Sequence, residues 1–130
     1  MKYLVTGGAG FIGSHIARTL LQQGGQVRIL DNFSSGKREN LKGLDLELIE
    51  GDLRDASKVA QAVKGVEIIF HEAAFVSVPE SMEKPQECFD INITGTSILF
   101  DAARKAGVRR VVIASSAAVY GDSEADPLSE

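Results

Sequence analysis

Residues 3–13 read Tyr-Leu-Val-Thr-Gly-Gly-Ala-Gly-Phe-Ile-Gly, so a short apolar run passes directly into closely spaced glycines. Apolar residues then recur at helical spacing over 11–23, which places the glycines between a strand and a helix. In such a turn one glycine makes the sharp bend, Gly10 lets the backbone approach a pyrophosphate, and Gly13 lets the helix lie close to the strand. The free amides at the helix N-terminus would face that anion. The stretch predicts a dinucleotide-binding turn, with a purely structural turn as the alternative.

An acidic residue stands where a dinucleotide site of this kind needs one. Asp31 follows the next apolar run, 26–30, and a carboxylate there can accept both ribose hydroxyls of an adenosine. It would repel a 2′-phosphate, which favours NAD over NADP, and Lys37 and Arg38 soften that repulsion. A strand-end turn residue is the alternative for Asp31. Asp52 follows the third apolar run, and the sequence leaves a turn residue and an adenine contact equally open.

Strand and helix patterns alternate along the chain. Strands separated by helices need crossover connections, and right-handed crossovers build a parallel sheet with helices on both faces. We therefore expect an α/β fold, a doubly wound parallel sheet of the Rossmann type with strand order 3-2-1-4-5. The expected strands are 3–6, 26–30, 46–50, 66–70 and 110–114. The expected helices are 11–23, one capped by Asp55 and ended by Gly65, and 85–106 with Gly107 at its end, while 32–43 is a loop with room for a helical turn.

Several candidate residues follow the later strands, at the edge where such sheets bind ligands. The small alanine pair 73–74 would let a nicotinamide ribose lie against the backbone. We interpret His71 beside it as a packed, hydrogen-bonded residue rather than a base. The serine pair 115–116 lacks the glycines of a nucleophile elbow, which leaves a substrate-orienting hydroxyl or a sheet-end hydrogen bond. Asn92 is a poor helix former inside the long predicted helix, which indicates a surface position or a ligand contact.

Composition narrows the class of protein. The 130 residues are 44% hydrophobic and 25% charged, the balance of one globular domain rather than a disordered chain. A net charge of −4 and 6% aromatic residues argue against a nucleic-acid binder, and no apolar run approaches the ~18 residues of a membrane span. The single cysteine, Cys88, indicates a reducing compartment, so we expect a cytoplasmic protein. No spacing of His, Cys and acidic residues predicts a metal site.

Taken in order, these motifs resemble the N-terminal part of extended short-chain dehydrogenases/reductases of the NAD-dependent epimerase/dehydratase family. The resemblance spans residues 1 to about 128. Within it, 75–81 is similar to UDP-glucose and UDP-N-acetylglucosamine 4-epimerases. The stretches that carry the resemblance are 6–15, 30–32, 51–53, 71–74, Asn92-x-x-Gly95-Thr96 and 115–121.

The resemblance implies a cofactor, a substrate and a reaction. NAD is the expected cofactor and a UDP-sugar the expected substrate, epimerised at its 4-position by hydride transfer through a 4-keto sugar. Ser116 is the expected catalytic serine and also contacts the substrate, while Ser77 falls beside the sugar nucleotide. The complete protein is expected to be a homodimer. The residues expected to hold NAD are Gly7, Gly10, Phe11, Ile12, Gly13, Asp31, Asn32, Asp52, Leu53, Ala73 and Asn92.

The family's Tyr-x-x-x-Lys pair, whose tyrosine removes the proton from the sugar 4-hydroxyl, is missing from this sequence. The tyrosines are Tyr3 and Tyr120, and Gly7 and Glu124 stand four residues after them. We therefore expect 1–130 to be a single NAD-binding domain that stops before the substrate-binding part and is inactive alone, either as a truncated protein or as a natural minimal domain. The alternatives are a non-catalytic NAD-binding module and a nucleotide-sugar dehydratase or reductase of the same family.

Overall fold

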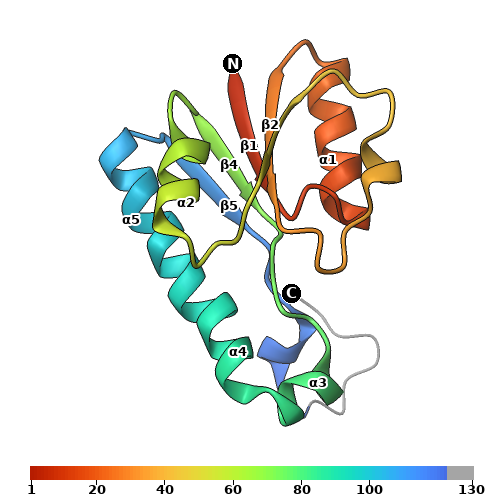
Figure 1. Cartoon of the computed structure of the whole chain (residues 1–130), viewed down its shortest axis with the longest axis vertical. Coiled ribbons are helices and arrows are strands. Elements are labelled where there is room, and N and C mark those ends of the chain that lie inside the picture. Colours follow the sequence, from red (N-terminus) through yellow and green to blue (C-terminus); the bar gives the residue numbers. More distant parts are fainter. Residues whose placement is uncertain (123–130) are drawn as a thin grey trace.

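A five-stranded parallel sheet forms the centre of the molecule (Figure 1). The computed structural model describes residues 1–122 and has the strand order β3-β2-β1-β4-β5 that the sequence predicts. Thr6 pairs with Leu30 on one side and with His71 on the other, so the carboxyl ends of the three central strands meet at one edge. The strands are β1 (Lys2–Thr6), β2 (Gln26–Asp31), β3 (Glu47–Glu50), β4 (Ile68–His71) and β5 (Arg110–Ile113).

Helices cover both faces of this sheet. Figure 1 shows α1 (Phe11–Gln22) on one side, and α2 (Ala56–Val63) and α5 (Thr96–Ala106) together on the other. Because successive strand side chains point to opposite faces, Leu4 and Val5 enter two separate cores. The core on the α2 and α5 side includes Leu4, Leu30, Val59, Ile69 and Leu99, and the core under α1 includes Val5, Ala17, Leu20, Val27 and Ile29.

The predicted helix over 85–106 is not a single α-helix. α4 (Pro85–Phe89) passes into a π-helical turn over Asp90–Gly95, which continues directly as α5. A π turn inserts one extra residue into the helical path and is frequent at functional sites. This turn contains Asn92, whose presence inside a helix the sequence leaves unexplained. Gly107 ends α5 in the left-handed region at φ 72°, as predicted.

Short helical elements complete the described chain. The sequence predicts no element where α3 (Val78–Glu83) forms, since six residues are too few for a hydrophobic period to emerge. A 3-10 turn at Arg38–Leu41 lies inside the predicted loop 32–43, and a second covers Ala117–Tyr120. α3, α4 and the second 3-10 turn gather beyond the carboxyl edge of the sheet, in the lower part of the molecule in Figure 1, whereas the turn at Arg38–Leu41 lies beside α1.

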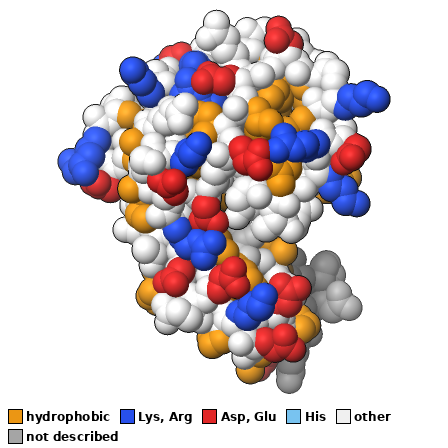
Figure 2. Space-filling view, viewed as in Figure 1, with side chains coloured by type: hydrophobic (Ala, Val, Ile, Leu, Met, Phe, Trp, Pro, Cys, Tyr) orange, Lys and Arg blue, Asp and Glu red, His pale blue; other side chains and the backbone are white. Residues whose placement is uncertain are grey.

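The surface mixes charges of both signs. Basic and acidic side chains are interspersed on the face shown in Figure 2. Asp101 on α5 pairs with Arg104 and Lys105 about one turn further along, and such exposed pairs contribute only a few tenths of a kcal/mol. Within residues 1–122, no helix combines the length and the apolar character that crossing a membrane requires.

One charged side chain is built into the interior. Arg28 on β2 is 6% exposed, and its Nη1 donates to the carbonyl oxygens of Gln61, Ala62 and Lys64 at 3.2, 2.6 and 2.8 Å. Its Nη2 lies 2.9 Å from the carboxylate of Glu47 on β3, and this contact lowers the pKa of Glu47. Arg28 therefore ties β2 to β3 and satisfies the carbonyls that α2 leaves without helical partners.

Replacing Arg28 by methionine should lower the free energy of unfolding by about 2–4 kcal/mol, because three carbonyls at the end of α2 lose a charged donor. Urea denaturation followed by circular dichroism measures the change. Arg38→Met is the matched control, because the Arg38–Glu50 pair is more than half exposed and should change stability by no more than about 0.5 kcal/mol. Equal losses in both variants would contradict the role assigned to Arg28.

Candidate functional site

The glycine turn joins β1 to α1 with no space for side chains. Gly7 has φ 66°, and a Cβ there would lie 2.7 Å from the amide nitrogen of Ala73, after β4. A Cβ on Gly13 would lie 2.4 Å from the carbonyl oxygen of Gly7. The first contact holds the turn against the end of β4, and the second holds α1 against the turn. Both observations confirm the predicted close packing of strand, turn and helix.

The N-terminus of α1 carries free backbone donors. Gly10 is the N-cap residue and provides no side-chain cap, and the first turn contains no acidic side chain. By contrast, the carboxylate of Asp55 accepts the Ser57 and Lys58 amides that begin α2. The amides of Phe11, Ile12 and Gly13 therefore lack an intrahelical partner and stand at the positive end of the helix dipole. This arrangement suits an anion.

Asp31 is buried and fixed beside this turn. Its residue is 7% exposed, and its carboxylate accepts the amides of Ala9 at 2.9 Å and Phe33 at 2.8 Å. Each carboxylate oxygen accepts more than one hydrogen bond, so capacity remains for ligand hydroxyls. Phe33 has φ 55°, the one positive φ of a non-glycine residue within 1–122. Asp31 is therefore held at the wall of the glycine turn, as the dinucleotide pattern predicts.

One of the two cations that could soften repulsion of a 2′-phosphate, Arg38, is engaged elsewhere. Arg38 pairs with Glu50, and its guanidinium lies 4.2 Å from the centre of the Phe33 ring. These contacts turn its charge toward the end of β3, outside the set of residues that line the groove described below. Lys37 is exposed on the same loop. The fixed Asp31 carboxylate, with Arg38 turned away, favours a 2′-hydroxyl over a 2′-phosphate at this position.

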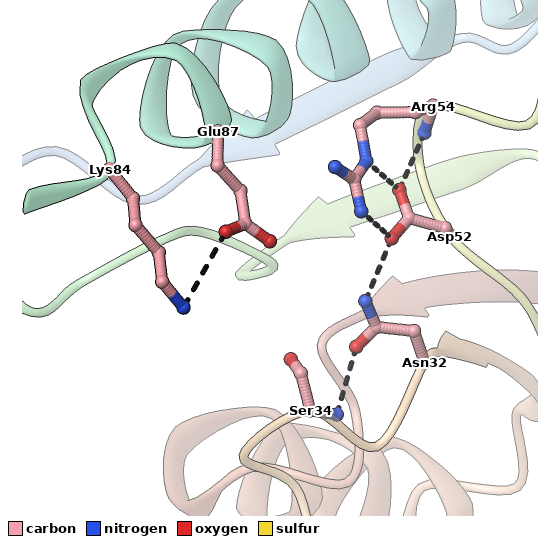
Figure 3. Close-up of polar contacts among 6 residues, drawn as sticks. All are labelled: Asn32, Ser34, Asp52, Arg54, Lys84 and Glu87. Atoms are coloured by element: carbon pink, nitrogen blue, oxygen red, sulfur yellow. Dashed lines mark hydrogen bonds and ion pairs between the residues drawn. The ribbon is translucent and has the colours of Figure 1, made fainter. Parts of the chain in front are cut away.

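Asn32 and Asp52 meet across the ends of β2 and β3. Figure 3 shows the Asn32 amide donating to Asp52 at 2.9 Å, and Arg54 gripping the same carboxylate through Nε and Nη2, each at 2.8 Å. The hydrogen bonds from Arg54 hold the pKa of Asp52 well below its usual range and raise the pKa of Arg54. In the same view, the ion pair between Lys84 and Glu87 at α4 lies across from the hydrogen-bonded Asn32, Asp52 and Arg54. Asp52 therefore stays ionised and firmly oriented at the groove.

Asn92 holds the loop that follows β4. Its Oδ1 accepts the Phe75 amide at 2.7 Å, and its Nδ2 donates to the Phe75 carbonyl at 3.0 Å. The side-chain amide thus pairs with a backbone in the manner of a neighbouring strand and fixes the loop against the π turn. This contact explains why a poor helix former occupies the helix. Its predicted contact with NAD stays a prediction, because the amide is directed at Phe75.

His71 is the packed residue that the sequence predicts. It is 4% exposed, with Nδ1 at 2.6 Å from Thr6 Oγ1 and Nε2 at 2.9 Å from Thr96 Oγ1. Thr6 Oγ1 also accepts the Ala73 amide at 3.3 Å, and each threonine hydroxyl can donate to or accept from the ring nitrogen beside it. Burial lowers the pKa of His71 to about 4. A neutral imidazole therefore links β1, β4 and α5.

The two serines expected near the substrate lie outside the core of the site. Ser77 begins α3, and its hydroxyl accepts the Glu80 amide at 3.3 Å. Ser116 is exposed after β5, and its hydroxyl accepts the Ala118 amide at 3.2 Å. Each hydroxyl keeps its proton available for donation to another group. Their substrate roles stay predictions.

A groove of about 380 Å³ brings most of the predicted cofactor residues together. It runs along the carboxyl edge of the sheet from the end of β2 to the loop after β4. Within residues 1–122, no group of three or more His, Cys, Asp or Glu side chains is placed to hold a metal ion. The predicted residues that line the groove are Gly7, Gly10, Phe11, Ile12, Gly13, Asp31, Asn32, Asp52, Leu53 and Ala73.

Sequence reasoning missed several residues of the same groove. The loop after β2 contributes Ser34, Ser35 and Gly36, and the π turn contributes Ile91. The position of 34–36 directly after a strand is a signal that could have found the loop, since every such loop opens on this edge. Ile91 had no such signal, because its place depends on the π turn. Glu72, Phe75 and Val76 were also missed as lining residues, although 71–74 stood out in the sequence and Ala74, which the sequence did predict, lines the groove.

Comparison with known protein families decides the classification. The profile of the NAD dependent epimerase/dehydratase family matches residues 3–130. The chain belongs to this family. It is 44% identical to a UDP-glucose 4-epimerase of Klebsiella pneumoniae over 138 aligned positions, covering 100% of this chain and 99% of that protein.

Two solved structures are similar to this chain in both fold and sequence. A UDP-glucose 4-epimerase from Stenotrophomonas maltophila with bound NAD and formylated UDP-arabinopyranose has a TM-score of 0.91 and 37% identity, covering 98% of this chain and 40% of that one. A UDP-N-acetylglucosamine 4-epimerase from Methanobrevibacter ruminantium in complex with UDP-N-acetylmuramic acid has a TM-score of 0.89 and 41% identity, covering 99% and 42%. The chain thus spans about two fifths of the length of these two relatives.

The stability of the protein should fall as His71 is forced to take up a proton. The unfolded chain protonates this imidazole near pH 6.5, whereas the folded protein resists until about pH 4. The folded state therefore loses about 3 kcal/mol as the pH falls across that interval. Urea denaturation of the wild type and His71→Asn at several pH values between 7 and 4 isolates this slope as their difference. The exposed His15 gives the control, and a slope that persists in His71→Asn but not in His15→Asn would contradict the assignment.

Proposed function

We propose that this chain binds NAD in the groove and forms the cofactor half of a nucleotide-sugar 4-epimerase. The observation that carries the proposal is the cradle at the start of α1: free amides at Phe11, Ile12 and Gly13 beside a glycine turn whose backbone a Cβ would obstruct. Asp31 stands beside it for an adenosine ribose. A diphosphate flanked by two ribonucleosides has the shape and charge for such a groove.

The residues of the groove fit the two halves of the cofactor differently. The adenosine half belongs at the β2 and β3 ends, where Asp31, Asn32 and Asp52 offer oriented polar atoms and Leu53 an apolar surface for the adenine. The diphosphate belongs at Gly10–Gly13. The nicotinamide half then extends toward Ala73 and the loop that Asn92 fixes. When bound, NAD supplies an acceptor for a hydride and returns it later in the reaction.

For the complete protein we propose the redox-neutral interconversion of UDP-hexoses at the sugar 4-position. The support is the likeness to three 4-epimerases, and the motif 115–121, in which Ser116 follows β5. Ser116 orients the sugar 4-oxygen by donating its free hydroxyl proton, and Ser77 lies on the sugar-nucleotide side. In this proposal a group other than Ser116 removes the 4-hydroxyl proton, and the family's Tyr-x-x-x-Lys pair does not occur in residues 1–130. We propose a second copy of the protein as its partner in a homodimer.

A non-catalytic role is the second candidate for the 130-residue chain itself. The same missing Tyr-x-x-x-Lys pair favours it. A general base contributes about 10²–10⁴-fold to a proton-transfer step, so a chain without one should bind the cofactor and turn over no sugar. The two candidates share the groove and differ in the reaction.

Isothermal titration calorimetry should show one NAD⁺ bound per chain. Gly7→Ala should weaken NAD⁺ binding by at least about tenfold, because its Cβ would meet the Ala73 amide 2.7 Å away and displace the turn. NADP⁺ should bind more weakly than NAD⁺, because its 2′-phosphate would face the Asp31 carboxylate.

Gly24→Ala is the matched control for this titration. Gly24 has φ 79°, so it carries the same backbone strain, but a Cβ there meets no atom within 4 Å. It should lose about 1 kcal/mol of stability and keep the wild-type affinity for NAD⁺. No heat from the wild type at millimolar NAD⁺ would reject the proposed cofactor site.

The reaction is tested on the longest natural protein that carries this sequence. Incubation with UDP-glucose should give UDP-galactose without net consumption of NADH, as followed by NMR of the sugar protons. Ser116→Ala should lower kcat by about 10²-fold or more, because the sugar 4-oxygen loses an oriented donor. A stable 4-keto-6-deoxy sugar would indicate a dehydratase, consumed NADH a reductase, and no conversion of several UDP-hexoses would reject the epimerase.

A further inference from the structure

Glu72 is the one groove-lining acid without a partner among residues 1–122. The other two are occupied: Asp31 accepts two backbone amides, and Asp52 accepts Arg54 and Asn32. The carboxylate of Glu72 makes no hydrogen bond or ion pair with the described residues. The residue is half-buried, so its side chain is partly removed from water. Burial raises the pKa of this carboxyl. A partly desolvated charge without a partner is unfavourable, so the residue invites an explanation.

The position of Glu72 is fixed by the sheet. Phe70 packs into the core under α1 and His71 points to Thr96 on the opposite face, so the alternation of strand side chains places Glu72 on the α1 side. Its backbone abuts the glycine turn, since a Cβ on Gly7 would lie 3.0 Å from the Glu72 carbonyl carbon. Glu72 therefore stands at the carboxyl end of β4, on the same side of the sheet as the start of α1.

Within residues 1–122, no positively charged side chain lines the groove to pair with the Glu72 carboxylate. The residues that line the groove in that range include the three acids and no Lys, Arg or His. A diphosphate in this groove would therefore meet backbone amides and uncharged side chains rather than a cation. No positive charge from the described residues lines the groove beside Glu72, so we look for one in the ligand, at the end of the groove away from Asp31.

We propose that Glu72 makes the site discriminate between the two redox forms of its cofactor, favouring NAD⁺ over NADH. The inference rests on the proposed function, which places the adenosine at Asp31 and so sends the nicotinamide toward β4. The nicotinamide ring carries a positive charge in NAD⁺ and none in NADH, and the two molecules are otherwise nearly the same shape. A carboxylate at this end of the groove therefore attracts one form and leaves the other unaffected.

The consequence for an epimerase is chemical. A site that stabilises the oxidised form keeps the resting cofactor as NAD⁺ and makes hydride uptake from the sugar less favourable. The same preference makes the reduced form a stronger hydride donor, which favours return of the hydride to the 4-keto sugar. Glu72 is a specificity-determining residue in this account, and it takes no proton from the substrate.

The experiment compares the dissociation constants of NAD⁺ and NADH for the wild-type chain and Glu72→Gln, by calorimetry at about pH 8 where the carboxylate is ionised. Glu72→Gln should shift the ratio of the two constants by roughly three- to tenfold in favour of NADH, the effect of one charge several ångströms away in a partly solvated site. The shift should lie mainly in the affinity for NAD⁺. Glu72→Lys should move the ratio further in the same direction.

Glu67→Gln is the matched control, because Glu67 precedes the opposite end of the same strand and pairs there with Arg109 and the N-terminal ammonium. It removes the same charge from the chain and should leave the ratio unchanged. A wild-type ratio in both Glu72 variants, with NAD⁺ still bound, would overturn the inference and leave the proposed function intact. Absence of binding by the wild type to either form would overturn both. Circular dichroism establishes that each variant is folded before titration.

Discussion

No side chain fits between Gly7 and the loop that follows β4, and the rest of the site depends on that contact. A Cβ at Gly7 would lie 2.7 Å from the Ala73 amide, and one at Gly13 would lie 2.4 Å from the Gly7 carbonyl. Strand, turn, helix and neighbouring strand are therefore locked together through backbone alone. The free amides of α1 are positioned by the fold rather than by side chains, and such donors do not reorganise when an anion arrives.

The same edge is held from the other face by a chain of hydrogen bonds. Thr6, His71 and Thr96 connect β1, β4 and α5, and Thr6 also accepts the Ala73 amide that meets Gly7. Two residues further along this loop, Asn92 fixes Phe75 from the π turn. The Thr6–His71 contact is buried and the others are partly buried, so an unmade hydrogen bond there would cost more than it does in water. The groove is thus the surface of a rigid frame, and Asn92 belongs to its supports.

The sequence predicts the frame better than the details that complete the groove. Gly7, Gly13 and Asp31 sit where the nucleotide pattern places them, because that pattern records steric and charge constraints local to one turn. His71 was correctly interpreted as packed, because an imidazole at a buried strand end needs partners. Asn92 could be identified as an anomaly but not explained, since its partner Phe75 lies seventeen residues away and the π turn has no hydrophobic period of its own. α3 was missed because its start depends on a single cap at Ser77.

The hydrogen bond that the Ser116 hydroxyl accepts limits the role that this residue can have. The oxygen of its hydroxyl is occupied by the Ala118 amide, so the group is biased to donate its proton rather than accept one. A donor in that position suits an oxygen that gains electron density, and it is a poor activator of a hydroxyl that must lose a proton. In the reaction that we propose, the base is therefore a separate group. Under that proposal the described residues bind the cofactor and Ser116 orients the sugar 4-oxygen, while another group removes the proton.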